Sequence, residues 1–246
     1  MPQRPVGPSA NLAQAFVSLV VLVFFSRNLG CLDQELSYIE FFAGKGNVFN
    51  AVKEVYPAAA VDLEYLRDPR FKRNNPMDLN SDSGLALAIW LVLQGRLDSF
   101  YVLLATVCSS WVPTNAGTSK RSVIYAEGNT KLPYIADANC LTSRSILICL
   151  LVCCLGGTFL LEQPGSSLMR YYFRWVWLRQ KIPVFRVAWW MKMYGAPTAK
   201  RHQAFTNNPY AEEYNLGKLK PSRYKSNVKT VRRWVDKAGK KRWAGT

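Results

Sequence analysis

The chain has 246 residues, of which 49% are hydrophobic and 20% are charged, and its formal net charge is +16 at pH 7. This length and composition are typical of one globular domain and exclude a wholly disordered chain. Residues 1–162 carry as many acidic as basic side chains, so the whole positive excess lies in residues 163–246. The division favours a polyanionic partner, nucleic acid above all, at the C-terminal third; the alternative is a solvated basic tail.

The cysteines favour a reducing compartment. Four of the six (Cys140, Cys149, Cys153 and Cys154) lie in one apolar stretch, no CxxC pair occurs in the sequence, and there is a single histidine. This pattern is typical of neither a disulfide framework nor a structural zinc site. We therefore expect an intracellular protein, nuclear or cytoplasmic, that binds no metal.

The first expected element is the apolar stretch at residues 12–25. It is shorter than the ~20 residues that a membrane-spanning helix needs. It has the length of a signal-peptide core, but no small-x-small cleavage site follows it. We expect a helix packed on the sheet that follows, and targeting or membrane contact through this segment is the alternative.

A short buried strand is expected at residues 38–42, followed by a tight turn and a helix at residues 48–55. The turn contains Gly44 and Gly46, which adopt positive φ without strain and let the backbone approach a ligand. Because Asn47 follows Gly46, the turn lacks the Lys-Ser/Thr pair of a phosphate-binding P-loop. The pattern is typical of a turn that holds a nucleotide-like ligand.

A second apolar strand, at residues 58–63, ends beside two acids, Asp62 and Glu64. In nucleotide-binding α/β folds, an acid roughly 20 residues beyond the glycine turn contacts a ribose hydroxyl. Asp62 is the candidate for that contact.

The run Phe41-Phe42-Ala43-Gly44-Lys45-Gly46 resembles the first motif of the class I S-adenosylmethionine-dependent methyltransferases, especially the phage-type DNA cytosine-5 methyltransferases. Those enzymes usually carry another glycine where this chain has Asn47. The resemblance implies a Rossmann-like α/β sheet with helices on both faces and S-adenosylmethionine as the cofactor. The cofactor-binding residues that it implies are Phe42, Gly44, Gly46, Asp62 and Asp78.

Asp78 also has a local interpretation. A helix is expected at residues 84–93, and either Asp78 or Ser81 could cap its start. Ser81 is closer to the helix and is the better candidate for the cap, so the role of Asp78 stays open.

The third expected strand, at residues 100–105, is apolar throughout, as central parallel strands require, and it leads to Cys108. By the resemblance, Cys108 corresponds to the cysteine nucleophile of the cytosine-5 enzymes, with Val107 and Ser109 replacing the neighbouring proline and glutamine. A thiolate that adds to C6 of cytosine makes C5 nucleophilic enough to accept a methyl group. The alternatives are a buried structural thiol, or an exocyclic-amine methyltransferase in which Trp111 stacks on the base.

A helix at residues 137–155 is expected to lead into a fourth strand at residues 158–161, directly before Glu162. By the resemblance, Glu162 contacts the N3 and N4 edge of a flipped cytosine. Because the ends of parallel strands face one crevice, Cys108 and Glu162 are expected to lie together. The single histidine, His202, is assigned no role.

Basic and aromatic side chains alternate at residues 170–179, and a fifth strand is expected at residues 184–190. The alternation suits a surface that stacks bases and neutralises phosphate, although aromatic residues at helical spacing also form cores. Residues 194–208 resemble the end of phage-type relatives of the cytosine-5 enzymes. The residues expected to bind nucleic acid, DNA in preference to RNA, are Lys120, Arg121, Arg170, Arg174, Lys200, Arg201, Arg232 and Arg233.

The expected organisation is an apolar segment (residues 1–30), a methyltransferase-like α/β domain (31–208) and a basic tail (209–246). The predicted function is methyl transfer to nucleic acid, at cytosine C5, through Cys108 and Glu162. Two alternatives stay open: a decayed methyltransferase fold that only binds nucleic acid, and an exocyclic-amine methyltransferase.

Overall fold

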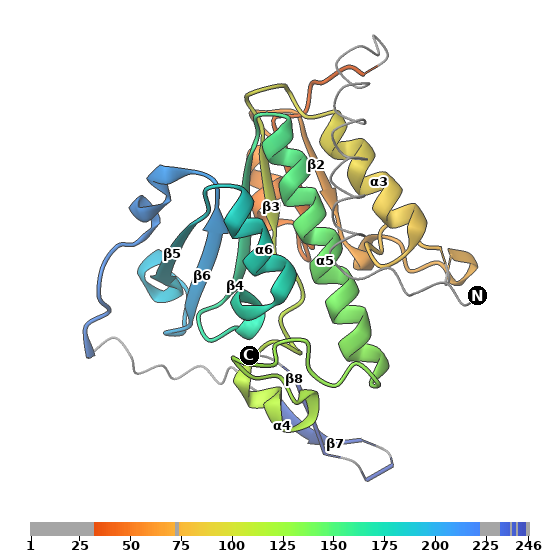
Figure 1. The fold of residues 1–246 in the computed structure, drawn as a ribbon, viewed down its shortest axis with the longest axis vertical. Helices are drawn as coiled ribbons and strands as arrows, with labels where there is room; N and C mark the ends of the chain where they lie inside the picture. Colours follow the sequence, from red (N-terminus) through yellow and green to blue (C-terminus); the bar gives the residue numbers. More distant parts are fainter. Residues whose placement is uncertain (1–31, 72–73, 222–231, 237, 240, 245–246) are drawn as a thin grey trace, which may run out of the picture.

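The computed structural model describes residues 32–71, 74–221, 232–236, 238–239 and 241–244 (Figure 1). The apolar stretch at residues 12–25, expected to be a helix, lies outside the described residues, so that expectation stays a prediction.

The described chain forms a mixed six-stranded sheet with the strand order β2-β1-β3-β4-β6-β5. The strands are β1 (Tyr38–Phe41), β2 (Ala58–Val61), β3 (Tyr101–Leu104), β4 (Thr158–Pro164), β5 (Phe185–Trp190) and β6 (Arg201–Thr206). The first four are mutually parallel, whereas β6 is antiparallel to both of its neighbours, β4 and β5. The predicted α/β class is confirmed, and the sheet is consistent with a Rossmann-like fold.

Three helices cover one face of this sheet (Figure 1): α3 (Asp82–Leu93), α5 (Pro133–Cys154) and α6 (Phe173–Lys181). The main core lies between them and the strands. It contains Ile39 of β1, Leu104 of β3, Phe159 of β4 and Trp175 of α6, all of them fully buried. Alternate residues of the strands thus enter this core, and the residues between them point to the opposite face.

The opposite face carries much less helix. The six-residue helix α2 (Asn47–Val52) lies over β1 and β2, and the 3₁₀ helix η6 (Pro209–Tyr214) lies over β5. The expectation of helices on both faces therefore holds only in a reduced form. The cause is the hand of the crossovers. The chain moves from β1 to β2 in one direction and makes its later crossovers in the other, so right-handed connections put α3, α5 and α6 together.

Several element boundaries differ from the sequence-based expectation. The helix expected from residue 137 begins at Pro133, whose fixed φ and missing N–H suit the first helical position. The strand expected to end at residue 161 continues to Pro164, because β6 pairs with this extension. Ser81 caps α3 as predicted, since its Oγ accepts the Gly84 N–H at 2.9 Å.

The remaining short elements lie in the connections. They are η1 (Leu63–Tyr65), η2 (Pro69–Phe71), η3 (Pro113–Asn115), α4 (Ala116–Ser119), η4 (Leu168–Tyr171) and η5 (Met191–Tyr194). Strands β7 (Arg232–Val235) and β8 (Lys241–Ala244) form a separate antiparallel hairpin within the basic tail. Ala211 and Leu219 are buried, so the folded domain extends past residue 208.

The helix α5 is the one described helix that is long and apolar enough to cross a membrane. Most of this apolar helix is buried inside the protein, as is usual for a helix packed on the centre of a sheet. Its cysteines Cys140, Cys149, Cys153 and Cys154 are free thiols, as is Cys108. Burial raises the pKa of Cys149 and Cys153, which agrees with an inert structural role.

Candidate functional site

The candidate site lies at the carboxyl edge of the parallel strands, where β1 separates β2 from β3. From β1 the chain passes to β2 on one side, whereas β3 lies on the other side of β1. The direction of the strand order therefore reverses at β1, which makes this a topological switch point. Ligands of open α/β sheets bind outside the carboxyl ends of strands at such points. We call the turn at residues 42–46 together with Asp62 the turn end of the site, and Cys108, Glu162 and His202 the thiol end.

The turn end is held closed by the Asp62 carboxylate. Its Oδ2 accepts the Gly44 N–H at 2.7 Å, and its Oδ1 accepts the Glu64 N–H at 2.8 Å. A Cβ added to Gly44 (φ +55°) would meet no atom within 4 Å, so the space beside this residue is open. An ionised carboxylate has further lone pairs, so Asp62 can hold the turn and still accept a ribose hydroxyl.

Backbone strain accompanies this turn. Phe42 has φ +63°, and Gly44 and Gly46 are also left-handed. A non-glycine residue in this region costs about 1–3 kcal/mol and persists only where its surroundings impose it. The Phe42 N–H donates to the Val61 carbonyl at 2.8 Å, and its side chain packs against the core. Strain held in place beside open space is typical of a ligand-binding turn.

Glu40 is a site residue that the sequence-based reasoning missed. It is buried in β1, where its Oε2 accepts the Phe49 N–H at 2.7 Å and the Tyr38 hydroxyl at 3.3 Å. It thus satisfies an N–H in the first turn of α2, whose N-cap, Gly46, has no side chain to do so. Burial raises the pKa of Glu40. A lone carboxylate within an apolar strand was the available signal.

Among the described residues, Asp78 has only local partners. Its carboxylate accepts the Asn80 N–H at 2.9 Å, its carbonyl accepts from Ser81 Oγ, and its N–H donates to the Asn75 carbonyl. The structure therefore uses Asp78 in the turn before α3, and its predicted contact with the cofactor stays a prediction.

At the thiol end, the buried Gln163 joins the ends of β3 and β4. Its Nε2 donates to the carbonyl of Thr106 at 2.6 Å, and its Oε1 accepts from Ser167 Oγ at 2.9 Å. Thr106 is two residues before Cys108, and Gln163 is adjacent to Glu162. This bond fixes the segment that carries the thiol against the strand that carries the carboxylate, and sequence reasoning did not identify it.

Cys108 is half-buried, and burial raises the pKa of its thiol. The positive charge of Lys200 lowers that pKa, whereas the negative charge of Glu162 raises it. Glu162 and Lys200 therefore lie close enough to Cys108 for their charges to act on its thiol, and all three are predicted site residues. The balance favours the protonated thiol, so nucleophilic attack requires removal of a proton.

His202, to which we assigned no role, contacts the predicted catalytic carboxylate. Its Nδ1 contacts Oε1 of Glu162, and both side chains are largely buried. Its Nε2 is also buried and has no hydrogen-bond partner among the described residues. The long-range pairing of β4 with β6 creates this contact by setting Pro164 opposite His202.

Arg121, predicted to bind nucleic acid, is instead a buried structural residue with 3% exposure. Its guanidinium donates to the Glu127 carbonyl and to Ser110 Oγ, both at 3.2 Å, and lies 3.4 Å from the Trp111 ring centroid. Burial lowers its pKa to about 10. Trp111 is itself fully buried, so in this structure it is not placed to stack on a base. Sequence position could not show that the loop folds back on itself.

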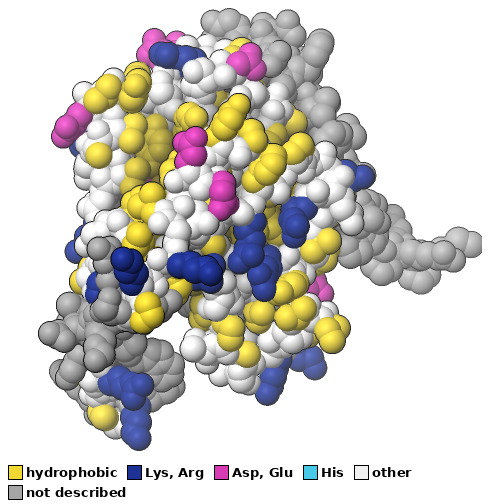
Figure 2. All heavy atoms as spheres, turned by 90° about the vertical axis from the view of Figure 1, so that its left-hand side faces the viewer, with side chains coloured by type: hydrophobic (Ala, Val, Ile, Leu, Met, Phe, Trp, Pro, Cys, Tyr) yellow, Lys and Arg dark blue, Asp and Glu magenta, His cyan; other side chains and the backbone are white. Residues whose placement is uncertain are grey.

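The other predicted basic residues are distributed unevenly. Arg170 and Arg201 belong to a group with Arg179 and Arg186, which we call the arginine cluster. Burial lowers the pKa of Arg186, and the positive charges of the other three arginines lower this pKa further, because they lie near it. Figure 2 shows a band of Lys and Arg side chains across the face of the molecule that it views. Arg174 stacks on Phe173, whereas Lys120 and Arg233 are exposed and Arg232 begins β7.

Comparisons with known proteins add no identification. The chain matches no protein-family model, and no curated protein matches its sequence. The interpretation of the site therefore rests on its geometry and on the resemblance of its motifs.

Proposed function

We propose that this protein is an S-adenosylmethionine-dependent methyltransferase that acts on cytosine C5 in nucleic acid. The observation that carries the proposal is the convergence of two predicted groups at one edge of the sheet. A strained glycine turn closed by Asp62 lies at the ends of β1 and β2, and Cys108, which follows β3, lies near Glu162 of β4.

The turn end fits the cofactor in two respects. A side chain at Gly44 would meet no atom within 4 Å of its Cβ, and a close backbone approach to a ligand requires such open space. Asp62 offers a partly exposed carboxylate at the end of β2, where a ribose hydroxyl would lie. Phe42, Gly44 and Asp62 would hold S-adenosylmethionine, which when bound supplies an electrophilic methyl group.

The thiol end fits the remaining chemistry. The Glu162 carboxylate would take the proton of the Cys108 thiol and pass it to N3 of a cytosine, while Sγ forms a bond with C6, so that the ring stays neutral. Once C5 carries the methyl group, the C5 proton passes to water, the thiolate leaves C6, and the N3 proton returns to Glu162. His202 would keep the Glu162 side chain in place during both proton transfers.

The arginine cluster supports nucleic acid as the substrate. Arg201 and His202 are consecutive in β6 and therefore point to opposite faces, and the positive charge that reaches the thiol end itself is that of Lys200, which acts on Cys108. Phosphates bound there would place a flipped base near Cys108.

The raised pKa of Cys108 favours a second candidate function, a methyltransferase fold that binds nucleic acid without turnover. The replacement of the proline and glutamine next to the cysteine by Val107 and Ser109 points the same way. Calorimetric titration with S-adenosylmethionine and with its demethylated product tests the main proposal. Saturable binding of both is expected. A correctly folded wild-type chain that binds neither compound would contradict the proposal that this protein is a methyltransferase.

A further inference from the structure

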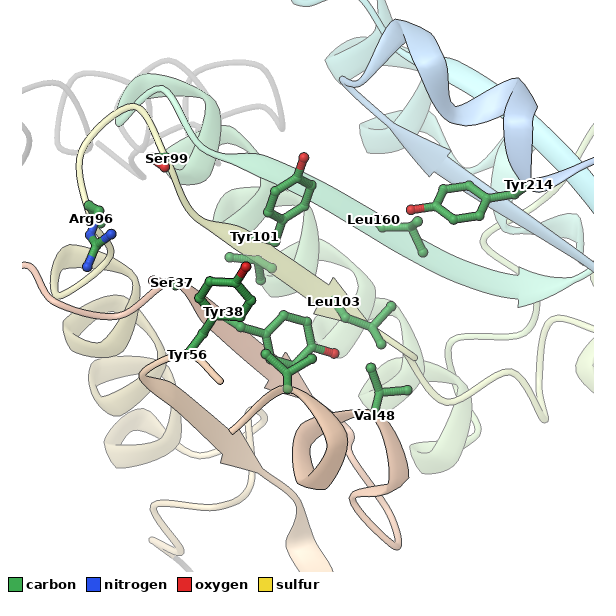
Figure 3. A pocket seen from close by; sticks show the side chains of 12 residues that line it. Ser37, Tyr38, Val48, Tyr56, Arg96, Ser99, Tyr101, Leu103, Leu160 and Tyr214 are labelled. Atoms are coloured by element: carbon green, nitrogen blue, oxygen red, sulfur yellow. The ribbon is translucent and has the colours of Figure 1, made fainter. Parts of the chain in front are cut away.

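The sheet has an open hollow of about 520 Å³ on the face opposite α3, α5 and α6 (Figure 3). It lies between α2 and η6 and is mainly apolar and aromatic. Its lining includes Tyr38, Val52, Tyr101, Leu103, Leu160 and Tyr214. We call this feature the sheet hollow. It contains none of the residues of the turn end or the thiol end.

The strand β3 shows how differently the two faces are covered. Val102 and Leu104 point into the main core with 1% and 0% exposure, whereas Tyr101, on the other face, is 51% exposed. Parallel strands in α/β proteins are normally covered on both faces. No described residue therefore gives the sheet hollow the cover that its strands require.

We propose that residues 12–25 of this chain cover the sheet hollow as an apolar helix. This stretch contains only two polar residues, Gln14 and Ser18, and a helix that is apolar on all sides needs burial on most of them. As a helix, its 14 residues would extend about 21 Å, enough to cross several strands spaced about 4.8 Å apart.

The place where the described chain begins supports this occupant. Leu36 forms a bridge with Gly95, and its N–H donates to the Gln94 carbonyl at 3.0 Å. The next residues on each segment, Ser37 and Arg96, line the sheet hollow. The chain therefore enters the sheet at the rim of the hollow. The connection at residues 26–31 can span up to about 20 Å, so residues 12–25 can reach the hollow without crossing the sheet.

Charge favours an uncharged apolar segment over nucleic acid at this place. Among the described residues, the one charged side chain that lines the hollow is Arg96, at its rim, and the neighbouring helix η6 carries the exposed acids Glu212 and Glu213. Residues 12–25 contain no charged side chain. Docking of this segment is also independent of methyl transfer, so the two proposals stand or fall separately.

A photo-crosslinking experiment on the full chain tests the inference. Benzoylphenylalanine placed at Tyr101, in the sheet hollow, should form an intrachain crosslink to the peptide that contains residues 12–25. Tyr125 is the matched control, because it is 52% exposed but lies outside the hollow. The double substitution Val17→Asp and Val21→Asp should lower the crosslink yield at Tyr101 about tenfold or more, since a buried unpaired charge is costly.

Three results would overturn the inference. The first is equal crosslinking from Tyr101 and Tyr125. The second is crosslinking between chains whose yield rises with protein concentration, which would show that a second copy covers the hollow. The third is flotation of the wild-type chain with phosphatidylcholine–phosphatidylglycerol vesicles without an intrachain crosslink, which would show that residues 12–25 are a membrane anchor. A wild-type intrachain crosslink independent of concentration supports the inference even if the Asp variant does not fold.

Discussion

The two ends of the candidate site are built in different ways. The turn end is made of backbone: left-handed Phe42, Gly44 and Gly46, held by one carboxylate that is close in sequence, Asp62. The thiol end is made of side chains from distant segments, because Gln163 bonds to Thr106 and His202 pairs with Glu162. The turn end thus depends on local conformation, whereas the thiol end depends on strand pairing. Mutations at the turn end should therefore weaken cofactor binding, whereas mutations at the thiol end should lower methyl transfer and leave cofactor binding unchanged.

The largest expected effect is at the thiol end. Cys108→Ser should lower methyl transfer by at least about 10³-fold while cofactor binding is unchanged, because the hydroxyl is a far weaker nucleophile. Wild type should form a denaturation-resistant adduct with 5-fluorocytosine in nucleic acid, because fluorine blocks elimination of the enzyme, and the variant should form none. Cys140→Ser, a half-buried thiol in α5, is the control. Methyl transfer retained in Cys108→Ser would contradict the cytosine-5 mechanism.

The next effect tests whether His202 holds Glu162. His202→Leu should lower kcat about 10- to 100-fold, because it leaves a largely buried carboxylate without its partner. His202→Gln can still donate a hydrogen bond and should recover part of this loss. The pH profile of kcat should change in the Leu variant, while KM for S-adenosylmethionine stays the same. Equal loss in Leu and Gln variants together with a raised KM would indicate a general structural role instead.

The third effect belongs to the turn end. Gly44→Val should weaken S-adenosylmethionine binding about tenfold or more, because it forces a branched side chain into left-handed backbone and into the open ligand space. Gly217→Val is the matched control: Gly217 also has positive φ and nothing within 4 Å of an added Cβ, but it lies beyond η6. Calorimetry measures both. Similar affinities of the two variants for S-adenosylmethionine would indicate that the turn is not part of the cofactor site.

The smallest effect concerns nucleic acid, measured as the slope of log affinity against log salt. The pair Arg186→Gln and Arg201→Gln should reduce this slope by about 2, one unit for each phosphate that is no longer neutralised. Arg121→Gln should leave the slope unchanged but lower the free energy of unfolding by about 1–3 kcal/mol, because it removes buried hydrogen bonds. An unchanged slope in the variant of the arginine cluster would indicate that nucleic acid binds to another surface of the protein.

Removal of the basic tail sharpens the same measurement. Since Ala211 and Leu219 are buried in the domain, the truncation belongs after residue 221 and not after residue 208. It should lower the salt slope further while S-adenosylmethionine affinity stays within about twofold, because residues 222–246 include Lys and Arg side chains that can neutralise phosphates but no predicted cofactor-binding residue. A decrease in cofactor affinity would show that the tail contributes to the folded domain.

The sequence by itself determined the local features. The positions of β1 to β5, the glycine turn, the Asp62 strand end and the Ser81 cap were predictable, because each depends on residues only a few positions apart or on the period of apolar side chains. Strands β6, β7 and β8 were not expected from the sequence. The expected proximity of Cys108 and Glu162 rests on the same kind of rule, since parallel strands present their carboxyl ends on one edge, but the extension of β4 to Pro164, which puts Glu162 inside the strand, did not follow from the sequence.

Only the tertiary structure decided the rest, because it depends on contacts between distant segments. The strand order placed three helices on one face and left the sheet hollow on the other. The antiparallel pairing of β4 with β6 brought His202 to Glu162, and the folding of residues 111–127 buried Arg121 against Trp111. An arginine in a loop looks the same in sequence whether it faces phosphate or an indole. Burial and strand order distinguish the two.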